Sequence, residues 1–397
     1  MKIAIIGTAH PFRGGIAHFN ERLSKELVSL GHTVKIINFT IQYPKILFPG
    51  KTQLSDDEKP SGLEIERSIN SINPLNWLLV GNRIKKENYE LVIIPFWLPL
   101  MGPSLATIGR IVKQNKTTKV ISIVHNAIPH ESRFGDKWFT KYFISAMHGF
   151  IAMTQKVKDD LRILGTNKPI NLTPHPIYDD FGTLFEKNMD QSRLNLSPDN
   201  NYLLFFGLVR EYKGLDLLIK AMAMIKIKKL KLIIAGEFYS NKAYYQQLID
   251  ELNIKHKIII FDSYIPNDQV ATFFSACDLV VQPYKTATQS GVTQIAYHFE
   301  KPMIVTNVGG LKEMCPNGKA GYVVEPNENE ISDAITKFYT NDVESHMKTE
   351  IVNIKKAYSW SIFVENIFSL TDKIDNEHKR TFFKKHKRVN SRQTKSN

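Results

Sequence analysis

The chain has 397 residues, 43% of them hydrophobic, and a formal net charge of +13. This size and composition predict about two domains with large apolar cores. The positive charge favours acidic partners, a class that includes nucleotides, phosphorylated substrates, anionic membranes and nucleic acid. The two cysteines, Cys277 and Cys315, stand in no metal-ligand spacing, which argues against a disulfide scaffold or a zinc site and fits a reducing cytosol.

The first half of the chain alternates strands and helices. We expect a strand, an amphipathic helix and a second strand at Lys2–Ile6, Ile16–Leu30 and Thr33–Phe39. Further strands are expected at Leu91–Pro95, Val120–Val124 and Gly149–Met153. The N-terminal apolar run is too short to predict a signal peptide, and prolines and glycines interrupt the uncharged run from Leu91 to Gly109. We therefore expect no membrane-spanning helix.

The second half begins a new series of strands. They are expected at Tyr202–Phe206, Leu230–Ala235, Lys257–Phe261, Asp278–Gln282, Met303–Thr306 and Tyr322–Val324. Two α/β domains of the doubly wound type follow from this pattern, with ligands expected where the carboxyl ends of the sheets meet. The predicted boundaries are 1–175 for the first domain, 176–200 for a linker, 201–357 for the second domain, 358–375 for a C-terminal helix packing back toward the first domain, and 376–397 for a tail.

The tail is strongly basic. From Asn376 onward it carries eight Lys or Arg residues against the single acid Glu377. We expect a disordered, solubilising tail, and the alternative is weak electrostatic anchoring to an anionic membrane, helped by Phe382 and Phe383.

The turn after the strand Tyr202–Phe206 is the first candidate site. It carries Gly207, Arg210, Lys213 and Gly214, and an apolar-periodic helix follows. Glycines let backbone approach a ligand, a helix N-terminus favours negative charge, and Arg and Lys donate to phosphate oxygens. The turn therefore suits a diphosphate, and the alternative is a solvated loop with ordinary surface cations.

A second glycine-containing turn follows the first strand. Gly14 and Gly15 open the helix there, but their spacing is not the G-x-G-x-x-G dinucleotide fingerprint, and the chain has no P-loop. Free amides at this helix start are suited to an anion, and a plain tight turn is the alternative.

Taken in order, these features resemble the two-Rossmann (GT-B) glycosyltransferases, and within them glycosyltransferase family 4 (glycosyl transferases group 1). The glycine pair precedes Ile16, His125 follows a strand of the first half, the Gly207–Gly214 turn resembles the family's diphosphate loop, and Lys301–Leu311 resembles the strand and loop that close the donor pocket. Tyr358–Trp360 resembles the start of the family's C-terminal helix. The resemblance covers the chain to about Asp375 and implies two facing Rossmann-like domains with a cleft between them, the first for the acceptor and the second for the nucleotide sugar.

The chain departs from the family at a pair of glutamates that hydrogen-bond the donor. Counting back from Lys301 puts these positions at Ala287 and Ile295, and a shift of one residue gives Thr286 and Gln294. Neither register holds a glutamate. We hypothesise that Gln289, Ser290 and Gly291 face the sugar and the β-phosphate at a helix N-terminus, and we include Gln294 among the donor-binding candidates. An ordinary polar helix cap is the alternative.

The resemblance implies a chemistry for these residues. Arg210 and Lys213 stabilise the leaving diphosphate, and His125 contacts the donor sugar, with retention of anomeric configuration. A satisfied core histidine is the alternative for His125. The chain contains no Asp-x-Asp, so metal-independent activity without a cofactor is expected, with UDP or GDP as the donor nucleotide.

Two segments are candidates for the acceptor or for a membrane. Ile41–Gly50 is apolar and bounded by prolines, and a lipid or glycan could dock there. In the second segment, the cations Arg133, Lys137 and Lys141 recur every four residues beside the aromatic Phe134, Trp138 and Tyr142. If helical, this segment suits an anionic membrane surface, and a core helix with a solvated basic edge is the alternative.

We therefore predict a cytoplasmic glycosyltransferase, peripheral on the inner face of the membrane, that adds a hexosyl or N-acetylhexosaminyl group to a glycan or lipid-linked acceptor of bacterial surface polysaccharide or glycoconjugate. The alternatives are a non-catalytic subunit that binds a nucleotide sugar, favoured by the missing glutamates, and a nucleotide-sugar epimerase on the same fold. Nucleic-acid binding is not expected, because the basic residues gather in the tail without a recognition module.

Overall fold

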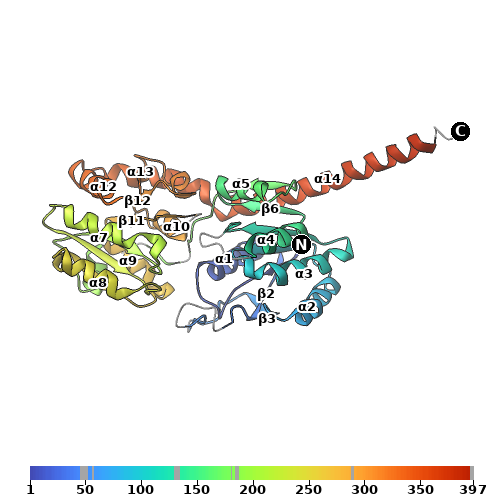
Figure 1. The fold of residues 1–397 in the computed structure, drawn as a ribbon, viewed down its shortest axis with the longest axis horizontal. Helices are drawn as coiled ribbons and strands as arrows, with labels where there is room; N and C mark the ends of the chain where they lie inside the picture. The colour runs from blue at the N-terminus through green and yellow to red at the C-terminus, as the bar shows by residue number, and fades with distance from the viewer. Residues whose placement is uncertain are drawn as a thin grey trace. The chain divides into compact units, whose positions relative to one another are not determined.

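The structure is a computed structural model that describes residues 1–44, 52–55, 58–128, 135–179, 181–183, 187–287 and 290–393, and for 188 and 378–393 it describes the backbone only. The chain divides into two compact units (Figure 1). Residues 1–45, 59–173 and 360–397 form the first unit, and residues 46–58 and 174–359 form the second.

The first unit is built on a seven-stranded parallel sheet. Its strands are β1 (Lys2–Ile6), β2 (Thr33–Ile41), β3 (Glu64–Asn70), β4 (Leu91–Phe96), β5 (Lys119–Val124), β6 (Gly149–Ala152) and β7 (Ile170–Leu172). They are ordered β3-β2-β1-β4-β5-β6-β7, so the order reverses between β1 and β4. This is the doubly wound arrangement that the alternating strands and helices predicted.

Helices cover both faces of this sheet. They are α1 (Gly15–Ser29), α2 (Pro74–Lys86), α3 (Gly102–Val112), α4 (Asp136–Ala146), α5 (Gln155–Ile163) and α14 (Trp360–Gln393), with the short 3-10 helices η2 (Pro99–Met101) and η3 (Lys113–Asn115). Right-handed crossovers to the two sides of β1 place α1 and α2 on opposite faces. Helix α3 packs between α2 and α4, while α14 packs on α1, β6 and β7 (Figure 1).

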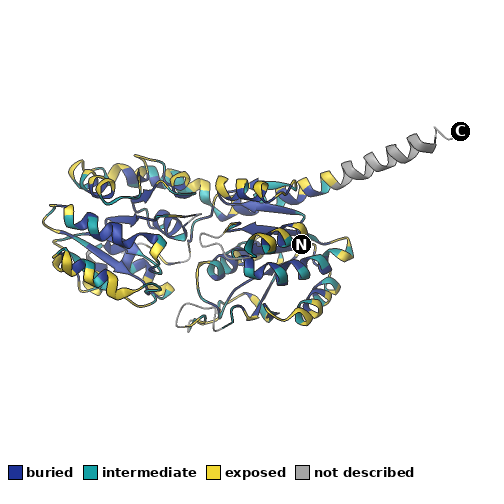
Figure 2. Ribbon diagram, in the orientation of Figure 1, coloured by how far each residue is buried: buried dark blue, intermediate teal, exposed yellow. Residues whose placement is uncertain are grey.

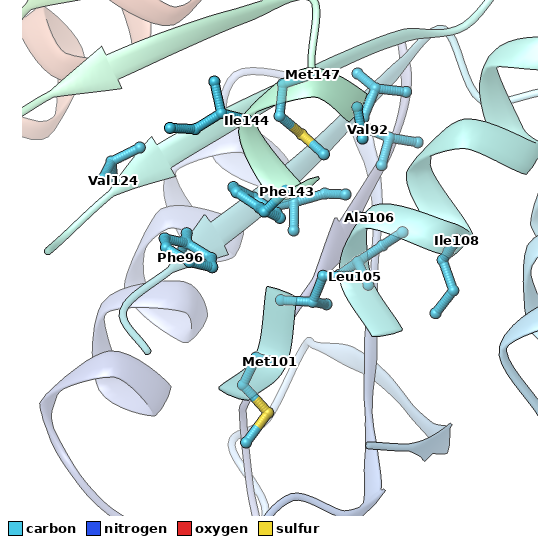
Figure 3. Close-up of a cluster of buried hydrophobic side chains, with 14 of the residues drawn as sticks. Val92, Phe96, Met101, Leu105, Ala106, Ile108, Val124, Phe143, Ile144 and Met147 are labelled. Atoms are coloured by element: carbon cyan, nitrogen blue, oxygen red, sulfur yellow. The ribbon is translucent and has the colours of Figure 1, made fainter. Parts of the chain in front are cut away.

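The core of the first unit lies between the sheet and the α2–α4 side. Alternate residues of β1, Ala4 and Ile6, point into it, as the period of two in a strand requires. Figure 3 shows part of this core, in which the rings of Phe96 and Phe143 stack with their centroids 4.1 Å apart. Both rings are almost completely buried, and a full burial of such a side chain stabilises the fold by roughly 1.5–3 kcal/mol.

The second unit repeats the topology with six parallel strands. They are β8 (Asn201–Phe206), β9 (Leu230–Ala235), β10 (Ile258–Phe261), β11 (Leu279–Gln282), β12 (Met303–Thr306) and β13 (Gly321–Val324), in the order β10-β9-β8-β11-β12-β13. The order reverses between β8 and β11, which pair directly. The prediction of two doubly wound parallel-sheet domains is therefore confirmed.

Helices of the second unit follow its strands in the same way. They are α6 (Lys187–Arg193), α7 (Leu215–Met224), α8 (Lys242–Glu251), α9 (Val270–Ala276), α10 (Gly291–His298), α11 (Leu311–Met314), α12 (Glu328–Thr340) and α13 (Glu344–Ile354), with the 3-10 helices η4 (Glu211–Lys213), η5 (Lys255–Lys257), η6 (Asn267–Gln269) and η7 (Lys355–Tyr358). In both units the strands are mostly buried and the outer faces of the helices are exposed (Figure 2).

The structure differs from the sequence prediction at three segments. Strands β3 and β7 were not predicted, because β3 is a charged edge strand and β7 has only three residues. Residues 176–200, expected as a linker, are grouped with the second unit and contain α6. Helix α14 runs through residues 376–393, for which the sequence favoured disorder, because the Lys and Arg residues there are good helix formers and extend a helix already nucleated on the first unit.

No helix among the residues that the structure describes is long and apolar enough to cross a bilayer.

Candidate functional site

The loops after β8 and β11 meet where the strand order of the second sheet reverses. In doubly wound sheets this is the position at which ligands bind, outside the carboxyl ends of the strands. The chain leaves β8 at Gly207, forms η4 and enters α7 through Gly214, while β11 leads through Pro283 and Tyr284 toward α10. The amide of Lys285 donates to the carbonyl of Tyr212 at 2.7 Å and ties the two loops together.

Gly214 and Gly236 allow the close backbone contacts in this region. Gly214 has φ 65°, and a Cβ there would overlap the carbonyl oxygen of Pro283. Gly236 has φ 150°, and a Cβ there would overlap the carbonyl oxygen of Gly207, which itself has φ 92° and donates its amide to the carbonyl of Ala235 at 2.9 Å. Only glycine combines this backbone conformation with such contacts without strain, so a side chain at Gly214 or Gly236 would disturb the turn.

Lys213 is the most unusual side chain of this turn. It is only 9% exposed, and its ammonium lies beside Gly207, 3.2 Å from the position that a Cβ of that glycine would occupy. Burial, together with the charge of Arg210, lowers the pKa of Lys213 from its ordinary value to about 7. The structure records no hydrogen bond from the ammonium and no carboxylate beside it among the residues that it describes.

Arg210 supplies a second cation on the same turn. Its guanidinium lies over the ring of Tyr239, 5.1 Å from the centroid, and has no carboxylate partner among the described side chains. The nearby acid Asp216 is taken by Lys285, at 2.8 Å. Two neighbouring cations without a counter-charge repel each other and are costly to bury. A dianionic group placed between them would remove both costs.

The start of α10 lies on the other side of Lys213. The ring of Tyr284 has its centroid 5.6 Å from the Lys213 ammonium, and its hydroxyl lies 3.2 Å from Ser290 Oγ. Ser290 caps α10 by accepting the amide of Val292 at 3.2 Å, and Gly291 packs against the ring of Tyr178. The cap that the sequence offered as an alternative for Ser290 is therefore present, and it lies in a chain of contacts that leads to Lys213.

The remaining donor-binding candidates of the second unit lie elsewhere. Gln289 falls outside the described residues. Gln294 is completely buried, with its amide nitrogen 3.9 Å from the sulfur of Met314, and no recorded contact joins it to Lys213. Ala287 and Ile295, at the family's glutamate positions, are buried apolar residues.

The candidates of the first unit lie after β1 and β5. Gly14 has φ 116° and precedes α1, which begins at Gly15 without a side-chain cap. Both glycines are exposed, and a Cβ at Gly14 would meet nothing within 4 Å. Asn20 and Asn38 hold the preceding loop through bonds to the carbonyls of Thr8 and Ala9, at 2.8 and 2.7 Å. The start of α1 is therefore a solvent-exposed helix N-terminus on a braced loop, a geometry suited to an anion.

His125 lies directly after β5. Its amide donates to the carbonyl of Phe96 at 2.8 Å, and its ring meets Phe19 of α1 edge to face, with centroids 4.9 Å apart. The side chain is 4% exposed. Phe19 also contacts Trp360, the first residue of α14, at a centroid distance of 5.2 Å. The histidine is thus packed as the core alternative supposed, and it stands at the carboxyl edge of the sheet where a catalytic side chain is expected.

Sequence reasoning missed two aromatic residues of the second unit. Tyr284 and Tyr239 face Lys213 and Arg210, yet each is far from its cation in sequence. The signal for Tyr284 was its position just after β11, which is the neighbour of β8 in this sheet topology. Within the described chain, no group of three or more His, Cys, Asp or Glu residues could hold a metal ion.

Comparisons with known proteins agree with this architecture. The model for glycosyl transferases group 1 matches residues 186–356, and the model for glycosyltransferase family 4 matches residues 13–181. An uncharacterized glycosyltransferase of Methanocaldococcus jannaschii is 23% identical over 95% of this chain and 99% of its own length. A lipopolysaccharide 1,2-N-acetylglucosaminetransferase of Salmonella typhimurium is 25% identical over 43% of this chain and 48% of its own.

Among solved structures, Anabaena HepE in complex with UDP and glucose superposes with a TM-score of 0.70, at 15% identity, over 94% of this chain and all of its own. This likeness shows the shared fold. One family model matches most of the first unit and the other matches most of the second unit, and each unit has its own parallel sheet. The chain therefore belongs to the group 1 and family 4 glycosyltransferases, enzymes of the GT-B fold.

Proposed function

We propose that this glycosyltransferase is a retaining, metal-independent enzyme. It transfers a hexosyl or N-acetylhexosaminyl group from a nucleotide-diphosphate sugar to a hydroxyl of a glycan or lipid-linked acceptor. The observation that carries the proposal is the pair Arg210 and Lys213, two cations on one turn without a carboxylate partner among the described side chains. A diphosphate is a ligand whose negative charge complements that pair.

The proposed chemistry follows from where charge develops. When the anomeric bond breaks, the leaving diphosphate gains negative charge, and fixed cations beside it stabilise the transition state more than the ground state. Arg210 contributes a planar fork of donors, and Lys213 contributes a buried point charge. Together they perform the charge neutralisation for which other enzymes use a metal ion. The start of α10, which Ser290 caps, is the candidate for the β-phosphate.

The first unit contributes His125 and the Gly14–Gly15 helix start to this proposal. We assign contact with the donor sugar to His125 and anion binding to the two glycine amides. We propose that the anomeric configuration is retained only because the chain belongs to this family. None of these three residues is needed to hold the nucleotide itself, which we assign to the second unit.

The donor and acceptor are proposed from the named relatives. HepE binds UDP, which favours UDP over GDP for this chain. The Salmonella relative is named for lipopolysaccharide, which favours an acceptor in bacterial surface-polysaccharide or glycoconjugate synthesis. Such an acceptor would place the enzyme in the cytoplasm, peripheral on the inner face of the membrane.

A thermal-shift panel of UDP- and GDP-sugars tests the donor, because a ligand that binds only the folded state raises the melting temperature. We expect one nucleotide class to stabilise the wild-type protein and Lys228→Ala, an exposed control in the second unit, but not Arg210→Ala. Stabilisation of all three proteins to the same degree would contradict the assigned site.

Measuring turnover distinguishes an enzyme from a protein that only binds the nucleotide sugar. The apolar residues Ala287 and Ile295, which stand where the family has glutamates, favour the second alternative. Release of nucleotide diphosphate or transfer of the sugar by purified protein is expected for the enzyme. Binding of a donor with neither reaction, in the presence of glycan and lipid-linked acceptors, would favour the binder.

A further inference from the structure

The described part of residues 174–183, which opens the second unit, contacts α10 at both ends of that helix. At the start of α10, the ring of Tyr178 lies against Gly291. At its end, Nε2 of His298 donates to the carbonyl of Gly182 at 2.7 Å. The sequence predicted a linker for most of these residues, whereas the structure packs them along the helix that carries the candidate site for the β-phosphate.

The close approach of Tyr178 accounts for the glycine at position 291. Gly291 is the first residue of α10 and does not have the left-handed backbone conformation that favours glycine. A Cβ there would lie 3.1 Å from Cε2 of Tyr178, with the hydroxyl oxygen and Cζ of the same ring at 3.8 and 3.9 Å. Any residue could adopt the backbone of Gly291, so it is the aromatic ring that leaves no room for a side chain.

Tyr178 is held in place by its own segment. The side chain is 4% exposed, and its ring meets that of Phe181 edge to face, with centroids 5.8 Å apart. Nδ1 of His175 lies 2.7 Å from the carbonyl oxygen of Pro176, and because a carbonyl only accepts, Nδ1 carries the proton. Nε2 is then an acceptor, to which the Tyr178 hydroxyl donates at 3.4 Å. The ring therefore has a fixed position that does not depend on α10.

The same segment is tied to the far end of α10 through Tyr358. The amide of Ile177 donates to the carbonyl of Tyr358 at 2.9 Å. The ring of Tyr358 lies 5.3 Å from that of Tyr297, which is completely buried and donates its hydroxyl to the carbonyl of Met314 at 2.5 Å. Helix α10 is thus fixed near its end as well, and Tyr178 makes the contact at the end where the phosphate is proposed to bind.

Two tyrosines from different loops hold consecutive residues at this helix start. The hydroxyl of Tyr284 lies 3.2 Å from Oγ of Ser290, and the ring of Tyr178 lies against Gly291. The attraction of a helix N-terminus for an anion falls off within its first turn, so the position of that turn decides how well a phosphate is held. A displacement of about 1 Å can lower the rate of a reaction about a hundredfold.

We propose that Tyr178 is a positioning residue for the donor, whose ring fixes the start of α10 against the β-phosphate of the nucleotide diphosphate. The proposal deepens the proposed function and rests on it, because that function places the β-phosphate at this helix start. A residue that only stabilises the fold would affect every ligand of the second unit alike. Tyr178 should instead affect only those ligands that carry a β-phosphate.

Calorimetric titration of the full chain with UDP and UMP, and with GDP and GMP, tests the proposal. The two ligands of each pair differ only in the β-phosphate, so the ratio of their affinities reports on the start of α10. We expect Tyr178→Leu to weaken binding of the preferred diphosphate at least about tenfold, and of its monophosphate by less than about twofold. Tyr178→Phe keeps the ring and should retain the wild-type ratio.

Gly291→Ala is a second test that leaves the tyrosine intact. Its methyl group must push the ring and the helix apart, so the same selective loss of diphosphate binding is expected. Tyr202→Leu is the control, because Tyr202 is also almost completely buried but lies near the amino end of β8, away from the site. It should lower the melting temperature and leave the ratio of affinities unchanged.

Melting curves identify the variants that fold. In those variants, an unchanged ratio or an equal loss for both ligands would overturn the proposal, and so would a loss in Tyr178→Phe as large as in Tyr178→Leu. Arg210→Ala separates this result from the proposed function. If it binds the diphosphate as wild type does, both proposals fail. If it loses affinity while the ratio is unchanged in Tyr178→Leu and Gly291→Ala, only the role of Tyr178 fails.

Discussion

The ammonium of Lys213 lies 5.6 Å from the ring centroid of Tyr284, and the hydroxyl of the same ring lies 3.2 Å from Ser290. Tyr284 therefore stands between the buried cation after β8 and the helix start after β11. An aromatic face attracts an ammonium by about 0.5–2 kcal/mol, depending on how far the pair is desolvated. This contact is the one favourable interaction that the structure records for the Lys213 ammonium within the described residues.

Tyr284 is the positioning residue for Lys213 in this account. We expect Tyr284→Leu to weaken binding of the donor by several-fold, because the ammonium loses the ring that holds it. Tyr284→Phe should retain most of the affinity, since it keeps the ring and removes only the hydroxyl. Calorimetric titration with the nucleotide sugar checks both variants, and equal losses in the two would assign the effect to the hydroxyl.

The pH dependence of donor binding follows from Lys213. Its pKa is lowered to about 7, so the free enzyme loses the charge as the pH rises through 7, and binding of a diphosphate above that pH must take up a proton. Affinity for a nucleotide sugar should therefore fall with rising pH, by up to about tenfold per unit. A nucleotide sugar is the suitable probe, because its diphosphate diester does not titrate near neutral pH.

The matched variant for this prediction is Lys213→Arg, whose guanidinium stays charged throughout. Its donor affinity should be flat across the same pH range, even if it is weaker. Proton uptake by the wild-type protein can be read from titrations in buffers of different ionisation enthalpy. A wild-type profile as flat as that of the arginine variant would show that Lys213 does not titrate in this range.

The close approach of Gly214 to Pro283 predicts a large effect of one methyl group. Gly214→Ala combines a left-handed backbone with overlap of the Pro283 carbonyl, so we expect a clear loss of melting temperature and of donor binding. Gly318→Ala is the control, because that glycine also has a positive φ but open space around it. It should cost only the backbone strain, about 1–2 kcal/mol. Equal effects at both sites would contradict the steric explanation.

The variant His125→Ala should affect the rate of sugar transfer without affecting nucleotide binding. Because the nucleotide is assigned to the second unit, we expect affinity for the free nucleotide diphosphate to stay near that of wild type. Turnover should fall by about a hundredfold or more, the usual scale for losing a group that acts in the transition state. Steady-state kinetics with a saturating donor measures this, and an unchanged kcat would remove His125 from the catalytic machinery.

Metal independence is a separate expectation. If Arg210 and Lys213 neutralise the leaving group, EDTA should leave the initial rate unchanged within error. Loss of activity with EDTA and its restoration by manganese would instead mean that the cation pair does not suffice.

Much of the fold was accessible from the sequence, because buried parallel strands are short apolar runs separated by helical periods. All six strands of the second sheet were predicted. The two strands that were not predicted, β3 and β7, lie at the two edges of the first sheet. Strand β3 is charged, and β7 is very short. Edge strands depend on a neighbour for their hydrogen bonds, and this dependence leaves little trace in local sequence.

The loop from Gly207 to Gly214 shows how far the sequence could predict the candidate site. Its residues and their suitability for phosphate could be predicted from Gly207 to Gly214, but the absence of a counter-charge could not. Asp216, three positions after Lys213, looks like a natural partner in sequence, yet it is bound to Lys285 from the loop after β11. Burial of Lys213 and its contact with Tyr284 likewise arise only when the two loops meet in the fold.

Calorimetric titration of the preferred nucleotide diphosphate tests most directly whether Arg210 and Lys213 bind the diphosphate of the donor. We expect tight binding by the wild-type protein and by Lys228→Ala. The double variant Arg210→Ala/Lys213→Ala should lose at least about a hundredfold in affinity, since each charged hydrogen bond contributes roughly 1.5–3 kcal/mol. Binding of equal strength by the double variant and the control would contradict this role for Arg210 and Lys213.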